Sequence, residues 1–132
     1  MKLIAHCCLP VLLSISLVTP VLAADDGYSP VFSSCMDASG GVTTNMLNCI
    51  GNETTVQDAR LNQAYKAAMQ AIAPEQQTQL RDAQRLWIKY RDANCGLYGS
   101  LTGGTIDRIN GAGCMLEMTR ERAVEIEGID EP

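Results

Sequence analysis

Four cysteines constrain this chain more than any other feature: Cys35, Cys49, Cys95 and Cys114 all lie beyond its first 23 residues. An even number of cysteines in a small exported domain is typical of a disulfide framework. Zinc-binding cysteines usually come in closely spaced pairs, and the spacing here is far wider. We therefore expect two disulfides, and no metal or other cofactor.

Residues 1–23 read as a secretory signal peptide. Lys2 gives a basic start, an apolar run follows from Cys8 to Leu22, and Ala23 provides a small residue for cleavage. Pro10 and Pro20 shorten the run below what a membrane-spanning helix requires. Cys7 and Cys8 lie too early to be lipid-attachment cysteines, so we expect a periplasmic or secreted protein with no stable membrane span after cleavage.

The remaining residues, 24–132, predict one helical domain with its core at about 35–127. Residues 24–43 read as an irregular lead-in pinned at Cys35. Apolar spacings of three and four predict helices over 45–73, 74–98 and from about 106 to 127. Gly51 marks a possible break in the first helix, and Gly111 and Gly113 could delay the start of the third. Pro74 suits the first position of a helix after a tight turn.

This pattern predicts an all-α fold: a small, disulfide-stapled bundle of three main helices, the first two forming an antiparallel helical hairpin. In an antiparallel hairpin, residues at equal distances from the turn lie at the same height. Counting outward from the turn at Ala73–Pro74 in this way places four polar residues on the helix faces that are expected to meet. We expect Asp58 to pair with Arg91, and Asn62 with Gln84, as a structural polar core.

The spacing of the cysteines leaves three connectivities open. The same level count favours Cys49–Cys95 with Cys35–Cys114, and Cys35–Cys95 with Cys49–Cys114 remains a close alternative. Either pairing would tie the lead-in and the third helix to the hairpin.

Charge and residue types narrow the function classes. The formal net charge is −5, and loss of Lys2 with the leader would make it −6. Such an acidic chain does not suit nucleic acid, whose phosphates require lysine and arginine. The domain has no histidine, no serine-centred elbow and no phosphate loop, so we expect a protein that is not an enzyme.

Several motifs together resemble the LprI-like lysozyme inhibitor family, over roughly residues 35–127. Cys35 and Cys49 match its two upstream cysteines. The other matching motifs are Asp58-x-x-Leu61-Asn62-x-x-Tyr65, Leu80-x-x-x-Gln84-Arg85-x-Trp87-Ile88-x-Tyr90-Arg91-Asp92-x-x-Cys95, Gly103-Gly104-Thr105-Ile106, and Cys114 with Met118-Thr119-x-x-Arg122.

The resemblance implies an exported helical protein that binds and inhibits a lysozyme, a peptidoglycan hydrolase. A cationic lysozyme would suit the acidic charge of this chain. The candidate partner-binding elements are the glycine-rich loop, with Gly103 and Gly104, and the i, i+4 row of Glu117, Glu121 and Glu125. The alternative is a structural or adaptor module of the cell envelope that binds another protein through a helix face.

Overall fold

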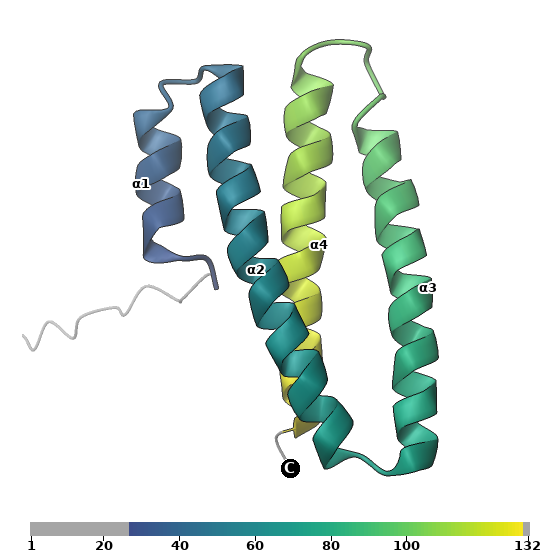
Figure 1. Ribbon diagram of the computed structural model, residues 1–132. Helices are drawn as coiled ribbons and strands as arrows, with labels where there is room; N and C mark the ends of the chain where they lie inside the picture. Colours follow the sequence, from purple (N-terminus) through teal and green to yellow (C-terminus); the bar gives the residue numbers. More distant parts are fainter. Residues whose placement is uncertain (1–26, 131–132) are drawn as a thin grey trace, which may run out of the picture.

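A computed structural model describes residues 27–130, which form four helices connected by short loops (Figure 1). The helices are α1 (Pro30–Ala38), α2 (Thr43–Ala71), α3 (Pro74–Tyr98) and α4 (Ile106–Asp130). Within these residues there is no strand, so the predicted all-α fold is confirmed. The predicted signal peptide lies outside the described residues. No helix in the described part is long and apolar enough to cross a bilayer.

Helix α3 has the bounds that the sequence predicts. Pro74 occupies the first turn, where the missing N–H costs no intrahelical bond. The Ala73 N–H donates to Oε1 of Gln76 at 3.1 Å, which satisfies one more backbone group at this end. The helix ends before Gly99, whose N–H donates to the Cys95 carbonyl.

Helices α2 and α4 run without the interruptions that their glycines suggested. Helix α2 passes continuously through Gly51, and α4 begins at Ile106 despite Gly111 and Gly113. Cys49 and Ile50, just before Gly51, are buried. Burial of one helix face therefore outweighs the low helix propensity of single glycines.

The lead-in was wrongly expected to be irregular, because α1 occupies most of it. Pro30 stands in its first turn, and positive φ angles at Gly40 and Gly41 carry the chain from α1 into α2. None of its residues is buried. A helix without a buried stripe has no clear apolar period, which explains why the sequence pattern did not indicate it.

Helices α2 and α3 form the predicted antiparallel hairpin, but α4 returns between them (Figure 1). The largest interhelical contact is between α2 and α4; α3 packs mainly on α4, and α1 on α2. The spatial order is therefore α1, α2, α4, α3. The expectation that side chains of α2 and α3 would face each other directly is wrong.

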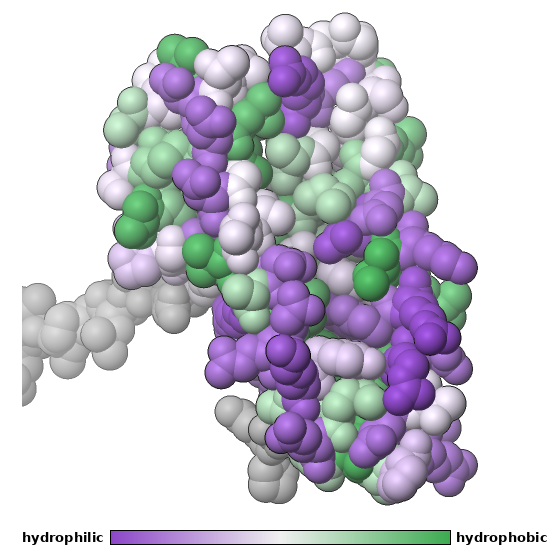
Figure 2. All heavy atoms as spheres, in the orientation of Figure 1, coloured by the Kyte–Doolittle hydropathy of each residue, from purple (hydrophilic) through white to green (hydrophobic). Residues whose placement is uncertain are grey.

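The apolar core lies toward the end of the bundle that holds the α2–α3 turn. Its buried residues are Leu61, Ala64, Ala68, Leu80, Ala123 and Ile126, with Tyr65, Met69, Ile72 and Trp87 packed around them. Ala64 and Ala68 of α2 and Ala123 of α4 are the small residues of this core. On the face shown in Figure 2, hydrophilic side chains cover much of this half of the molecule.

All four cysteines form disulfides, as predicted, but the favoured connectivity is wrong. The bonds are Cys35–Cys49, which ties α1 to α2, and Cys95–Cys114, which ties α3 to α4. The Cα–Cα distances are 5.7 and 5.4 Å. Because α4 packs against α3, it brings Cys114 to Cys95, while Cys49 bonds to Cys35 of α1.

Candidate functional site: a braced loop between α3 and α4

Asp58 and Asn62 do not belong to a buried polar core. Both are exposed on α2, and the Asn62 amide donates to the Asp58 carboxylate at 3.1 Å within the same helix. The predicted pairs with Arg91 and Gln84 are therefore absent. The reason is the position of α4, which occupies the space where α3 was expected to meet α2.

A polar layer does exist, but it joins α3 to α4. Arg91 donates to Oγ1 of Thr119 at 3.3 Å and to the neighbouring Asp92 at 2.9 Å. The Arg122 Nε donates to Oε1 of Gln84 at 3.0 Å. Arg91 and Gln84, which were predicted to pair with α2, thus have their partners on α4 and, for Arg91, on the neighbouring Asp92.

Trp87 organises this layer. The guanidinium of Arg91 lies 4.9 Å from the Trp87 ring centroid, and that of Arg122 lies 5.9 Å from it. Cation–π contacts of this kind contribute about 0.5–2 kcal/mol each. The long sequence motif around Trp87 therefore lies in the contact between α3 and α4.

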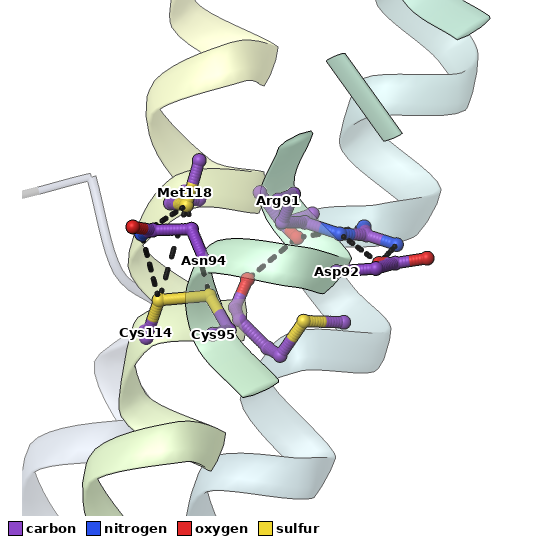
Figure 3. The surroundings of a disulfide bond; sticks show 8 residues. Arg91, Asp92, Asn94, Cys95, Cys114 and Met118 are labelled. Carbon is purple, nitrogen blue, oxygen red and sulfur yellow. Dashed lines mark hydrogen bonds and ion pairs between the residues drawn. A yellow bond between two sulfur atoms is a disulfide. The ribbon is translucent and has the colours of Figure 1, made fainter. Parts of the chain in front are cut away.

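The Cys95–Cys114 disulfide continues the α3–α4 contact toward the loop (Figure 3). The Sδ atom of Met118 lies 3.6 Å from Sγ of Cys95, and the Asn94 amide points at Met118 and Cys114 (Figure 3). Cys95 is buried. This cluster fixes the two helix segments that lead into and out of the 99–105 loop.

The loop itself is held by one buried carboxylate. Asp107, only 3% exposed, accepts hydrogen bonds from the Thr102 N–H at 2.9 Å, the Thr102 hydroxyl at 2.9 Å and the Gly103 N–H at 2.7 Å. Removal from water acts to raise the pKa of Asp107, but these hydrogen bonds outweigh it and hold the pKa below its ordinary value. An ionised Asp107 thus clamps the loop to the start of α4.

Glycines allow the close backbone approaches at this loop. A Cβ atom on Gly111 would lie 3.0 Å from the Gly99 Cα, so α4 touches the end of α3 through bare backbone. Gly103 has a φ of 74°, in the left-handed region that favours glycine. Gly103 and Gly104, predicted as partner-binding residues, are both exposed.

Three exposed apolar side chains lie in the loop or directly beside it in the sequence, and they were missed by the sequence analysis. They are Tyr98, Leu101 and Ile106, with exposed fractions of 45, 56 and 50%. The sequence signal for a braced loop was Asp107 in the first turn of α4, a position where an acidic residue favours the helix and can accept from preceding amides.

The predicted glutamate row is separate from the loop. Glu117 lies 11 residues along α4 from Ile106, or about 16 Å at the helical rise. It is engaged by the Tyr28 hydroxyl and by Arg120, while Glu125 pairs with Arg122. Glu121 is exposed. The row is thus partly neutralised within the molecule, and the structure does not join it to the glycine loop.

Tyr28 shows how strongly the N-terminal segment is attached to α4. Burial and the neighbouring Glu117 carboxylate raise the pKa of Tyr28 to about 12. The Arg120 guanidinium also lies 5.3 Å from the Tyr28 ring centroid. Nearby, the buried carboxylate of Glu53 accepts from the Ser29 N–H at 2.9 Å.

A pocket of about 290 Å³ lies between α1 and α2, and Glu53 is the one ionisable residue in its lining. That carboxylate is already bonded to Ser29 and Gln57. Within residues 27–130, no cluster of histidine, cysteine, aspartate or glutamate could hold a metal ion.

Comparison with known proteins places this disulfide-stapled helical bundle in a family. The family model for the lysozyme inhibitor LprI matches residues 35–126. The chain belongs to this family. It is also 35% identical, over 97 residues, to an uncharacterized protein of Rhizobium meliloti (strain 1021), an alignment that covers 63% of this chain and 70% of that protein. No solved structure matches the chain.

Proposed function

We propose that this protein is an exported inhibitor of a lysozyme, and that the braced 99–105 loop is the segment that enters the cleft of the hydrolase. The single observation that carries the proposal is the loop: exposed, yet clamped by Asp107 and closed at its base by the Cys95–Cys114 disulfide. A preorganised loop loses little conformational entropy on binding, which is what a tight inhibitor requires.

The chemistry of the loop suits a cleft built for sugars. Its residues are uncharged, and Leu101 and Thr105 are exposed. The hydroxyls of Ser100 and Thr102 donate within the protein, to the Gly96 carbonyl and to the Asp107 carboxylate. The carboxylate of Asp107 is turned inward to the loop amides. The loop therefore brings no exposed negative charge toward the two catalytic carboxylates of a lysozyme.

Charge at longer range supports the same partner. The chain carries a formal net charge of −5. A cationic lysozyme would be attracted to it before contact, which raises the association rate more than the final affinity. Two disulfides in a domain of this size also favour an oxidising compartment, such as the periplasm or the exterior of the cell. In this proposal the protein acts as a binding partner rather than as an enzyme.

A turnover assay with several lysozyme types tests the proposal. We expect the oxidised protein to slow peptidoglycan hydrolysis by at least one type at near-stoichiometric concentration. Leu101→Asp should raise the concentration for half-inhibition tenfold or more, because a charge in the interface must be desolvated next to the carboxylates of the target. That change corresponds to about 1.4 kcal/mol of binding free energy.

Val124→Asp is the matched control, since Val124 is 47% exposed on α4 far from the loop, against 56% for Leu101. It should inhibit like the unmodified protein. Absence of inhibition of every lysozyme type at a 100-fold molar excess would rule out the proposed function. Equal inhibition by the Leu101→Asp variant would instead rule out the loop as the inhibitory element.

A further inference from the structure

The two disulfides of this protein lie in different surroundings. The Cys35–Cys49 bond lies between two surface pockets, each of which is lined by both cysteines. One is the pocket of about 290 Å³ that contains Glu53, and the other, of about 270 Å³, lies toward Ser39 at the opposite end of α1. Cys49 is buried, whereas Cys35 is half-buried. A molecule from solvent therefore reaches this bond most directly at Cys35.

The Cys95–Cys114 bond is covered by neighbouring side chains, although Cys114 is also half-buried. The Sδ atom of Met118 lies 3.6 Å from Sγ of Cys95, and the amide nitrogen of Asn94 lies 3.6 Å from Sγ of Cys114 (Figure 3). The bond also lies within the contact between α3 and α4. Because a thiolate must touch a disulfide sulfur in order to break the bond, we expect Cys95–Cys114 to react more slowly than Cys35–Cys49.

Helix α1 can separate from α2 without disturbing the other helices. It lies at the edge of the bundle, packs mainly on α2, and buries none of its nine residues (Figure 1). A helix shorter than about 12 residues is marginally stable without tertiary contacts. Hydrogen bonds from Ser29 to the Glu53 carboxylate hold the start of α1. The disulfide and these hydrogen bonds therefore contribute much of the attachment of α1 to α2.

We propose that the Cys35–Cys49 bond is a site of thiol–disulfide exchange with a dithiol, which reduces it while Cys95–Cys114 stays intact. A thiolate of the dithiol attacks Sγ of Cys35, the bond between the two cysteines breaks, and Sγ of Cys49 leaves as a thiolate that takes up a proton. The second thiol of the dithiol then displaces Cys35. The dithiol is oxidised to a disulfide, and two cysteine thiols are formed.

Reduction at this site allows α1 to leave α2, so that the bond acts as a redox switch for α1. The 99–105 loop keeps its own support, because the Cys95–Cys114 disulfide and the Asp107 carboxylate hold it. The site therefore does not depend on the proposed inhibition of lysozyme.

Timed reduction with dithiothreitol tests the selectivity. Free thiols in the oxidised protein are alkylated with iodoacetamide at intervals after the reductant is added, and peptide mass spectrometry identifies the modified cysteines. We expect Cys35 and Cys49 to be alkylated at least about tenfold faster than Cys95 and Cys114, which corresponds to about 1.4 kcal/mol of activation free energy. Equal rates, or earlier alkylation of Cys95 and Cys114, would overturn the proposal.

Two serine variants test whether reduction releases α1. If it does, contacts that hold α1 stabilise only the oxidised form. Ser29→Ala removes the hydroxyl bond to Glu53, and it should lower by about tenfold the ratio of reduced to oxidised dithiothreitol at which half of Cys35–Cys49 is reduced. Ser34→Ala is the matched control, since its hydroxyl donates to the Val31 carbonyl within α1, and it should not lower this ratio. The same ratio for both variants and the unmodified protein would overturn the release of α1.

Discussion

Two polar positions on α2 show how single residues are separated by helix geometry. Gln57 is 2% exposed and donates to the buried Glu53 at 2.7 Å, while Asp58, one residue further, is exposed. One residue turns a helix by about 100°, which is enough to move a side chain from the packed face to solvent. The sequence indicated polar residues near a buried stripe, and the structure decided which of them it buries.

Glu53 gives a prediction at this scale. Burial acts to raise the pKa of Glu53, but hydrogen bonds from Ser29 and Gln57 lower it below the ordinary value of 4.5. A lowered folded-state pKa stabilises the protein fully at neutral pH, and this contribution is lost as the pH falls below about 4.5. Glu53→Gln should therefore lower the free energy of unfolding by about 1.5–3 kcal/mol at pH 7, which is the typical contribution of hydrogen bonds to a charged group.

Urea unfolding at pH 7 and at pH 3 measures this effect. The deficit of the Glu53→Gln variant should shrink at the lower pH, where the native carboxyl is also largely protonated. Glu75→Gln, at an exposed position in the first turn of α3, should change stability little at either pH. A deficit for Glu53→Gln that is independent of pH would contradict the role given to its charge.

At the scale of elements, α4 is the helix that organises the others. It packs against both α2 and α3, and its first turns meet the end of α3 through Gly99 and Gly111. Gly113 lies only two residues further along α4, but a Cβ atom placed there would meet no neighbouring atom within 4 Å. Position 111 thus has almost no room for a side chain, whereas position 113 does.

Alanine substitutions at Gly111 and Gly113 test this difference. Gly111→Ala should lower the free energy of unfolding by about 1–3 kcal/mol, because the new methyl group meets the backbone of Gly99. Gly113→Ala should raise it by about 0.5–1 kcal/mol, since alanine favours the helix and finds open space. Chemical denaturation of both variants measures the difference, and equal effects would contradict the close approach.

At the scale of the whole molecule, two kinds of interaction hold different regions. The apolar core lies mostly toward the α2–α3 turn, while the Cys95–Cys114 disulfide and the Asp107 clamp hold the loop at the other end. Helix α1 buries no residue of its own; it is tied to α2 by Cys35–Cys49 and, at its N-cap, by the Ser29 hydrogen bond to Glu53. The fold therefore has one well-packed unit and one tethered helix.

Removal of each disulfide should reveal this division. In Cys35→Ala/Cys49→Ala, amide exchange in α1 should accelerate strongly while protection of α2 and α4 changes little. Cys95→Ala/Cys114→Ala should lower global stability by about 2–4 kcal/mol and loosen the loop. Hydrogen exchange measured along the chain distinguishes the two outcomes. Global destabilisation by the first variant equal to that of the second would show that α1 belongs to the cooperative unit.

The sequence by itself determined the local features of this protein. Periodicity, Pro74 and Gly99 fixed the bounds of α3, and the cysteine count established two disulfides. The motifs around Trp87 pointed to the family. These features depend on residues close together in the chain, where spacing translates directly into geometry.

Only the tertiary structure decided which cysteines and which polar side chains pair with each other. The return of α4 between α2 and α3 set the disulfide connectivity, moved Asp58 away from Arg91, and joined Gln84 to Arg122. It also separated the glutamate row from the loop. Pairing residues at equal distances from a hairpin turn assumes that the two helices touch. Nothing within either helix reveals that a third helix is inserted between them, because the order of the helices in space is set by burial of the whole chain.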